Sequence, residues 1–452
     1  MKSLMNLIYF FLVILNYANS EYVVYNFKTN INLQEITDDN YIQKAFNQLL
    51  YTEVNIGEPS QLIPMTLKTW QYPTFVVSKD VTDNIKVKFD QTKSKTYKKD
   101  YESLISGLPK YDFNKGYLSL DTLNTSVEIK DLSFMLATEM SVGVKNISGG
   151  IGLAKENTEK DQLLPKKTHF IDQLVERKLI TKKILGFTYD TEYEGRLIFG
   201  GYLYEVEKNY QEKDMNEFDI DTDVTDEHNN MWMMKFNLNC LSGPDNEIIY
   251  EEKDSYGFFY IETGLIIGST VFKNNFAKSY FEKKGCKNTT VDASSHITVY
   301  YCTEESQFAD FPNITFKYPG KYNFTFTKDE LFVKRGKKYY FQIVFEIFTD
   351  DIVIKYWKIG QLFLKKYSVF FKQEDRGYKM SYYLTQKFPN PGLSTQTIVI
   401  IVLSVVVFIL SVGIIVYFVY FFPKRKKRAN ELADDYEYKA KEETNDKLMV
   451  NE

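Results

Sequence analysis

The stretch Met65-Thr66-Leu67-Lys68-Thr69-Trp70 is matched, in the other half of the chain, by Tyr260-Ile261-Glu262-Thr263-Gly264. In each stretch, largely apolar residues lead to one charged residue and then to a threonine. The first stretch is preceded by the turn-forming sequence Ile56-Gly57-Glu58-Pro59-Ser60-Gln61. The fold predicted for the chain, and the chemistry that it can perform, depend on these two stretches and on the segments around them.

The sequence around them is typical of β-strands. The 452 residues include 35 Phe and 35 Tyr, and runs such as 323–327 and 338–345 are rich in β-branched and aromatic residues. Helices are expected at 169–179 and at 271–284, the second after a Gly-Ser-Thr start that offers a cap. Because helices do not alternate regularly with strands, we expect a mostly β fold rather than a doubly wound parallel sheet.

The two ends of the chain have the pattern of a single-pass membrane protein. Residues 1–20 contain Lys2, an apolar run and small residues near position 20, as in a signal peptide. Residues 397–422 carry no charged side chain and are long enough to span a bilayer as a helix. Because five basic residues follow at 424–428, we expect a type I orientation with the ectodomain extracellular or luminal.

Charge and motifs exclude several functions. The formal net charge is −4, and no basic stripe precedes residue 424, so nucleic acid is not an expected partner. The three histidines, at positions 169, 228 and 296, are far apart and lack metal-ligand spacing. We therefore expect no metal and no cofactor.

The secretory route makes covalent modification relevant. Asn-x-Ser/Thr acceptor sites for N-glycosylation occur at Asn124, Asn146, Asn288, Asn313 and Asn323. Of the three cysteines, Cys286 and Cys302 would close a short loop, worth about 3 kcal/mol, and Cys240 would then be unpaired. The sequence alone does not fix this pairing.

From about residue 50 to residue 383 the chain resembles the pepsin-like aspartic proteases. Besides the two opening stretches, further segments follow in that family's order, at 51–59, 94–97, 116–122, 149–154, 170–174, 195–201, 311–316 and 357–367. The resemblance implies two β-rich lobes related by pseudo-two-fold symmetry, with a substrate cleft between them.

Combined with the chain ends, the resemblance gives an expected domain organisation. It comprises a signal peptide at 1–20, a propeptide-like segment or N-terminal strand at 21–47, lobes at 48–205 and 206–385, a stalk at 386–396, a transmembrane helix at 397–422 and a cytoplasmic tail at 423–452. The acidic stretch 206–230 is expected to be a solvated connection near the junction of the lobes. Few basic residues lie in 21–47, so a permanent strand at 22–27 is an alternative to a self-inhibiting propeptide.

The chemistry of the family should fail in this chain. Its members hydrolyse peptides with two Asp-Thr-Gly aspartates that share one proton. The matching positions here hold Lys68 and Glu262, and Trp70 replaces the first glycine. An ammonium has no lone pair to accept a proton from water. The longer Glu262 side chain moves its carboxylate by on the order of 1 Å, a shift that can reduce a rate about a hundredfold.

We expect Lys68 and Glu262 to form a buried ion pair between the lobes. The alternative is that the two residues changed independently and Lys68 points to solvent. The neighbouring residues expected in the cleft loops are Thr69, Trp70, Thr263 and Gly264. Family members also carry a tyrosine at the flap tip; counting back from Gly116 reaches Pro109, and Tyr111 is the nearest tyrosine.

Three functions remain compatible with the sequence. The leading hypothesis is a non-catalytic, membrane-anchored protein whose cleft binds an extended peptide or a partner. The second is an active aspartic endopeptidase with an altered dyad that depends on Glu262. The third is a surface or adhesion protein that uses the fold as a scaffold.

Overall fold

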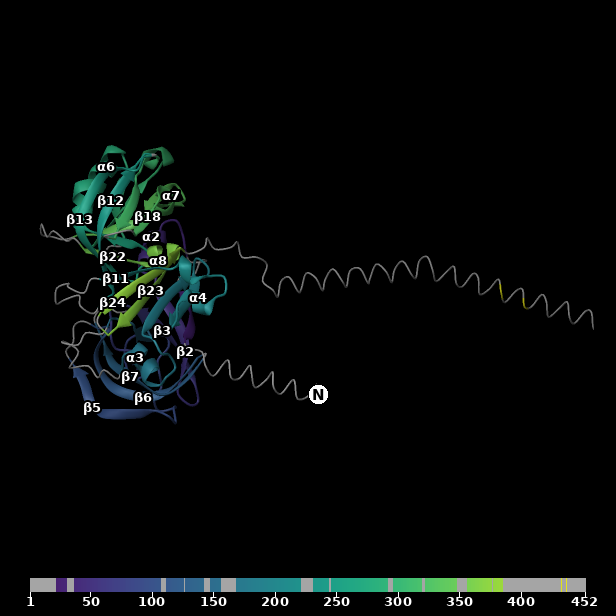
Figure 1. Cartoon of the computed structure of the whole chain (residues 1–452). Helices are drawn as coiled ribbons and strands as arrows, with labels where there is room; N and C mark the ends of the chain where they lie inside the picture. The colour runs from purple at the N-terminus through teal and green to yellow at the C-terminus, as the bar shows by residue number, and fades with distance from the viewer. Residues whose placement is uncertain are drawn as a thin grey trace, which may run out of the picture. The chain divides into compact units, whose positions relative to one another are not determined.

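The computed structural model describes most of the chain between residues 22 and 384 (Figure 1). The described residues are 22–30, 36–106, 111–125, 127–141, 147–155, 168–220, 231–243, 245–291, 296–318, 322–347, 356–375, 377–384, 432 and 436, with side chains left undescribed at 100–106. Residues up to Thr385 form one compact unit, and Gln386–Glu452 form another. Both sheets of the fold lie in the first unit.

The first sheet joins the strands of the first half to three strands from later in the chain. Its order is β11-β24-β23-β9-β10-β1-β2-β3-β8-β4-β7-β6-β5. The strands are β1 (Val23–Thr29), β2 (Leu50–Ile56), β3 (Gln61–Lys68), β4 (Phe75–Val77), β5 (Lys98–Ser106), β6 (Phe113–Asn124), β7 (Glu128–Met140), β8 (Gly149–Gly152), β9 (Ile184–Tyr189), β10 (Glu194–Phe199), β11 (Asn216–Ile220), β23 (Tyr367–Glu374) and β24 (Gly377–Leu384).

The second sheet lies in the other half of the unit, in the upper part of Figure 1. Its order is β18-β17-β12-β13-β22-β14-β21-β16-β20-β19, and β15 pairs with β16. The strands are β12 (Met233–Ser242), β13 (Glu247–Phe259), β14 (Ile266–Gly268), β15 (Lys287–Thr290), β16 (Ile297–Cys302), β17 (Asn313–Lys317), β18 (Asn323–Phe326), β19 (Phe332–Arg335), β20 (Lys338–Phe341), β21 (Ile343–Glu346) and β22 (Tyr356–Ile359).

The helices among the described residues are short and lie between strands. They are α2 (Tyr41–Phe46), α3 (Phe170–Glu176), α4 (Leu203–Val206), α5 (Thr270–Phe272), the π-helix η5 (Lys273–Ala277), α6 (Lys278–Lys283), α7 (Lys328–Leu331), α8 (Gln361–Lys366) and the 3₁₀ helices η4 (Glu212–Asp214) and η6 (Glu305–Phe308). A mostly β fold is therefore confirmed.

The two halves repeat one strand plan. In the first, β3 runs parallel to β8, β8 pairs antiparallel with β4, and β4 runs parallel to β7. In the second, β13 runs parallel to β22, β22 pairs antiparallel with β14, and β14 runs parallel to β21. Lys68 ends β3 and Glu262 follows the corresponding strand β13, so the repeat brings the two charged residues to equivalent places.

Each half has its own apolar core. Phe75, Val77, Phe113 and Met135 belong to a buried cluster of the first half. A separate cluster of the second half includes Leu265, Val299 and Val344, and it also buries Ile42 and Ala45 of α2. Within the segment expected at 21–47, residues 23–29 form β1 and residues 41–46 form α2, and the choice between a propeptide and a permanent strand stays a prediction.

Both predicted helices are present. The first is α3, whose Phe170, Ile171 and Leu174 are buried. The second is divided into α5, η5 and α6, and its expected cap is formed by Ser269, whose hydroxyl accepts a 3.0 Å hydrogen bond from the Phe272 N–H.

The expectation for residues 206–230 was wrong in part. Residues 216–220 form the edge strand β11, which pairs with β24, and Phe218 and Ile220 on it are buried. These apolar residues alternate with Glu217 and Asp219, which is the pattern of a half-buried strand, although the segment is acidic in composition. Residues 221–230 lie outside the described part of the chain.

The Cys286–Cys302 disulfide is confirmed, and Cys240 is a buried free thiol. The glycosylation acceptors Asn288 and Asn323 are exposed, Asn124 and Asn313 are half-buried, and Asn146 lies outside the described residues. The signal peptide, the stalk and the span at 397–422 also lie outside them. In the part of the chain that is described, no helix has the length and apolar character needed to cross a membrane.

Candidate functional site

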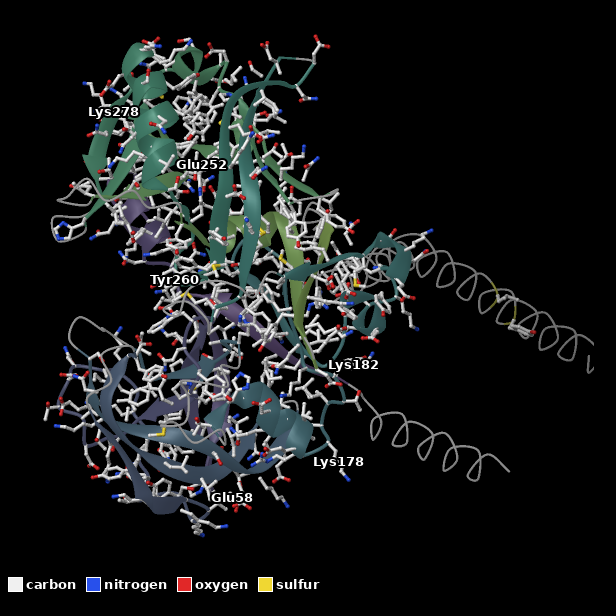
Figure 2. The ribbon with its side chains drawn as sticks, turned by 60° about the vertical axis from the view of Figure 1, so that its left-hand side comes forward. Glu58, Lys178, Lys182, Glu252, Tyr260 and Lys278 are labelled. Atoms are coloured by element: carbon white, nitrogen blue, oxygen red, sulfur yellow. A yellow bond between two sulfur atoms is a disulfide. The ribbon has the colours of Figure 1, made fainter. Side chains whose placement is uncertain are left out.

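The site is built where the two repeated loops meet. Lys68 is the last residue of β3, and Glu262 follows three residues after the end of β13. The adjacent Tyr260 lies at the junction of the two halves (Figure 2). Its N–H donates to the Ile359 carbonyl at 2.9 Å, which fixes the second loop against β22.

A glycine behind each loop lets the backbone approach closely. A Cβ on Gly152 would lie 2.0 Å from the Tyr72 carbonyl oxygen, and one on Gly360 would lie 1.9 Å from the Leu265 carbonyl oxygen. The residues that follow these glycines hold the loops by backbone hydrogen bonds. Leu153 N–H donates to the Lys68 carbonyl, and Gln361 N–H donates to the Thr263 carbonyl, each at 2.9 Å.

The centre of the site is a fully buried lysine ammonium between two carboxylates. Lys68 Nζ lies 2.7 Å from Glu262 Oε2 and 2.8 Å from Asp112 Oδ2. The Lys68 side chain has no exposed surface, and those of Glu262 and Asp112 are 10% and 8% exposed. The expected ion pair between Lys68 and Glu262 is therefore confirmed, and the alternative of a solvent-directed Lys68 is wrong.

The indole of Trp70 completes this cluster. Its Nε1–H donates to Glu262 Oε1, so both oxygens of that carboxylate have a partner. The Trp70 ring is half-buried, and the Lys68 ammonium lies 5.9 Å from its centroid. Trp70 thus fills space in the first loop and binds the charged residue of the second.

The electrostatics of the cluster favour a charged lysine. Burial acts to lower the pKa of Lys68, but the facing carboxylates of Glu262 and Asp112 outweigh it and raise that pKa. Burial raises the pKa of the Glu262 carboxyl; the Lys68 ammonium opposes this, and the Asp112 carboxylate adds to it. One ammonium cannot neutralise two carboxylates. Glu262 therefore holds a proton more readily than an ordinary glutamate does.

The two threonines of the loops play different roles. Thr69 Oγ1 donates a 2.6 Å hydrogen bond to the Phe259 carbonyl, which joins the first loop to the strand that leads to the second. Thr263 Oγ1 instead accepts the Leu265 N–H within its own loop at 3.2 Å. Gly264 N–H donates to the Ala45 carbonyl at 2.8 Å, so α2 supports the second loop.

Asp112 is the site residue that sequence reasoning missed. It immediately precedes β6, and its N–H lies 3.3 Å from Gln71 Oε1, its acceptor in the first loop. The ring of its neighbour Tyr111 stacks on Phe113 at 5.9 Å and packs against the core of the first half. In the sequence, Asp112 is only a single acidic residue between two aromatic residues. Such a pattern does not predict which basic residue the carboxylate pairs with.

Two glutamines that the sequence did not single out fix the second loop. Gln361 Nε2 donates to the Ile261 carbonyl at 2.7 Å and to the Gln48 carbonyl at 2.8 Å. Its Oε1 accepts the Tyr189 hydroxyl at 3.0 Å. A Cβ on Gly264 would lie 2.5 Å from Gln48 Oε1, so this glycine permits the close packing.

His169 packs behind the first loop, against Tyr72. Its ring stacks on Tyr72 at 4.3 Å, its Nδ1 lies 2.9 Å from Asp172 Oδ2, and its Nε2 lies 3.1 Å from the Ala154 carbonyl. His296 is exposed, and His228 lies outside the described residues. His169 therefore ties the loop to α3 and to the segment after β8.

This arrangement differs from a pair of proton-sharing aspartates, because a cation stands between its two carboxylates. Lys68 Nζ stands between Glu262 and Asp112, and it has hydrogen atoms to donate but no lone pair to accept a proton. What the site does provide is a charged link between three segments: the end of β3, the loop after β13 and the start of β6.

Two β-rich halves of one strand plan, meeting at equivalent threonine-containing loops, define the architecture of the pepsin-like aspartic proteases. The family model for eukaryotic aspartyl proteases matches residues 50–381, and the chain belongs to this family. A search of curated proteins found no match to the chain.

Proposed function

We propose that this chain is a membrane-anchored, non-proteolytic member of the aspartyl protease family whose interlobe cleft binds an extended peptide or a segment of a partner protein. One observation carries the loss of proteolysis. Lys68 Nζ lies within 2.8 Å of both Glu262 and Asp112, so an ammonium occupies the centre where the family needs two carboxylates and a water.

The binding part of the proposal rests on what the substitutions leave intact. The paired loops, their supporting glycines and the start of β6 remain as ordered elements of the fold. An extended peptide binds such a cleft through main-chain hydrogen bonds and side-chain pockets, and neither requires the catalytic dyad. Half-buried Trp70 would offer a peptide an aromatic surface beside the charged cluster.

A cleavage assay tests the loss of proteolysis. The purified full-length chain would be incubated with a broad fluorogenic peptide library from pH 3 to pH 7, beside the triple variant Lys68→Asp, Trp70→Gly, Glu262→Asp. We expect no cleavage by the natural chain. Acid-dependent cleavage that Glu262→Gln abolishes would overturn the proposal, and activity in the triple variant would show that the cleft still accepts substrates.

A capture experiment tests ligand binding. An extended-peptide library would be passed over the immobilised full-length chain, the Trp70→Ala variant and the control Glu58→Gln, whose site lies at the far end of the first half (Figure 2). We expect retained peptides whose capture falls with Trp70→Ala and is unchanged with Glu58→Gln. Absence of any capture would favour use of the fold as a scaffold.

Membrane anchoring is a separate part of the proposal, motivated by the uncharged segment 397–422 and the basic residues after it. The chain expressed in a eukaryotic cell should remain in membranes after alkaline carbonate extraction. Deletion of 397–422 should release it. Extraction of the natural chain by carbonate would contradict a spanning segment.

An active endopeptidase with an altered dyad is the second candidate. The observation that favours it is the presence of two carboxylates, on Glu262 and Asp112, around one centre. Environments that separate the pKa values of two carboxyl groups can produce an acid and a base. Against it, the Lys68 ammonium is within ion-pair distance of both groups, and the cleavage assay above decides between the candidates.

A further inference from the structure

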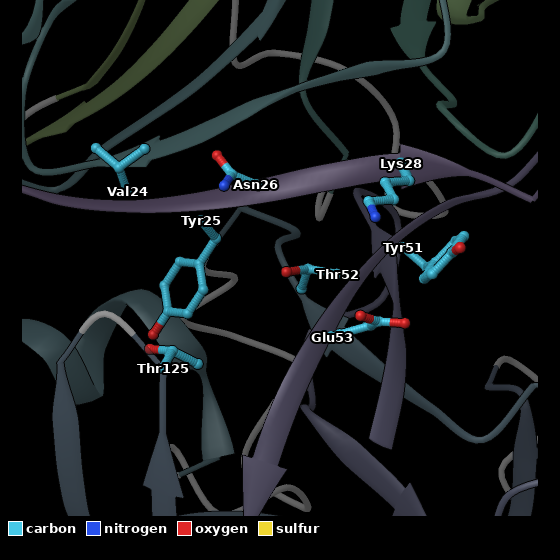
Figure 3. Close-up of a pocket in the computed structure, with 8 residues that line it drawn as sticks. All are labelled: Val24, Tyr25, Asn26, Lys28, Tyr51, Thr52, Glu53 and Thr125. Carbon is cyan, nitrogen blue, oxygen red and sulfur yellow. The ribbon is translucent and has the colours of Figure 1, made fainter. Parts of the chain in front are cut away.

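A second candidate binding site lies where β1 and β2 separate. The two strands pair at Lys28–Tyr51 and Thr29–Leu50 alone. Toward its N-terminus β1 pairs with β10, whereas β2 continues with β3 as its partner. The gap that opens between them is a cavity of about 350 Å³, and Thr125, which follows β6, also lines it (Figure 3).

The cavity carries opposite charges on its two walls. Lys28 on β1 and Glu53 on β2 both line it, and both are exposed. Within the described part of the chain neither takes part in a salt bridge or side-chain hydrogen bond, and they form no ion pair with each other. The hydroxyl of buried Thr52 and the amide of Asn26 lie on the same walls (Figure 3).

A buried hydroxyl also borders this cavity. Tyr25 is 3% exposed, and its side chain extends from β1 toward Thr125 (Figure 3). Burial raises the pKa of this phenol to about 12, and the nearby Thr125 hydroxyl opposes the shift. Among the described residues, the buried Tyr25 oxygen has no hydrogen-bond partner, although the Thr125 hydroxyl lies near it. A buried hydroxyl in this state is unfavourable until a ligand or solvent satisfies it.

We propose that this cavity binds a small zwitterion of the amino-acid or dipeptide class, with its carboxylate on Lys28 and its ammonium on Glu53. One molecule with both groups would satisfy both charges, which lack an ion-pair partner among the described residues, through charge-assisted hydrogen bonds. The volume is near the lower end of the roughly 300–1,000 Å³ typical of ligand pockets, which suits a ligand of this size. The site shares no lining residue with the Lys68 cluster and is independent of peptide binding in the cleft.

Saturation-transfer NMR on the purified full-length chain tests the proposal. The probes would be L-alanyl-L-alanine, its N-acetylated form, its C-amidated form and the doubly blocked form. We expect binding of the free dipeptide, weaker binding of each singly blocked form and none of the doubly blocked form. Equal binding of free and doubly blocked dipeptide, or no binding of either at millimolar concentration, would overturn the proposal.

Variants assign the signal to the cavity. Lys28→Met and Glu53→Gln should each weaken binding of the free dipeptide about tenfold or more, because the first removes a charge-assisted hydrogen bond and the second removes the charge that strengthens one. Tyr25→Phe removes the buried phenol oxygen that a ligand in this cavity would satisfy, and it should weaken binding about threefold or more. Glu58→Gln should have no effect. Binding that falls with Trp70→Ala but not with Lys28→Met would place the ligand in the interlobe cleft and overturn the assignment.

Discussion

Lys68 Nζ and Glu262 Oε2 are 2.7 Å apart, although the two residues are separated by 194 positions in the sequence. The contact joins the end of β3 in the first half to the loop after β13 in the second. Asp112 adds the start of β6 to the same ammonium. A buried charge is stable only when an opposite charge compensates it. The packing of these three segments against one another therefore depends on the Lys68 side chain.

Lys68→Met should destabilise the fold strongly at neutral pH. The variant leaves two buried carboxylates facing each other without a cation, and breaking a buried pair in this way costs about 3–5 kcal/mol. Urea unfolding at pH 7 measures the loss. The loss should become smaller at pH 5, because burial and the facing Asp112 carboxylate both raise the pKa of Glu262, and protonation of Glu262 relieves the repulsion.

The matched control for this prediction is Lys98→Met. Lys98 pairs with Asp131 at 2.9 Å, but both side chains are largely exposed. Exposed pairs are screened by solvent and contribute little. A comparable loss of stability in both variants would contradict the special role of Lys68.

Glu262→Gln should change the pH dependence of stability in a defined direction. The pKa of Glu262 is raised in the fold, chiefly by burial, so the folded chain binds this proton more tightly than the unfolded chain does. Its contribution is therefore fully present below the ordinary glutamate pKa of about 4.3 and is lost as the pH rises through the raised value.

Unfolding free energies of the natural chain and of Glu262→Gln, measured from pH 4 to pH 8, test this. The natural chain should lose stability relative to the variant as the pH rises, because glutamine does not ionise. A relative gain in stability with rising pH would mean that the Lys68 ion pair outweighs burial and would refute the predicted direction.

Thr69→Val should weaken the link between the halves. The threonine hydroxyl is buried and donates to the Phe259 carbonyl at 2.6 Å. Valine has nearly the same shape but leaves that carbonyl without this donor, at a cost of about 1–3 kcal/mol. Thr69→Ser keeps the hydroxyl and should retain most of the stability in urea unfolding. If valine and serine behave alike, this hydrogen bond contributes little.

The positions of Lys68 and Glu262 were predictable because each follows an apolar strand at the same place in a repeated plan. The Asp112 contact was not, because nothing local to residues 111–113 specifies which distant charge the carboxylate meets. Phe218 and Ile220 were hidden by their acidic neighbours, although they alternate as in a half-buried strand. Register across the centre of the molecule, such as Val369 beside Phe187, is set by long-range pairing that composition does not encode.

Gly152→Ala and Gly360→Ala should show that the two loops depend on the same close approach. A Cβ at either position would overlap a backbone carbonyl oxygen, at 2.0 Å for Gly152 and 1.9 Å for Gly360. Backbone atoms cannot rotate away as a flexible side chain can, so each variant must displace its loop, at a cost of about 1–3 kcal/mol or more.

In Gly201→Ala the nearest atom is the Tyr22 Cβ at 3.0 Å, which makes it a milder control. In thermal unfolding, the melting temperatures of both loop variants should lie well below that of the control. Equal decreases for Gly152→Ala and Gly360→Ala would indicate that the two repeated loops contribute equally to stability. Stability close to that of the control in either variant would mean that its loop can move without disturbing the Lys68 cluster.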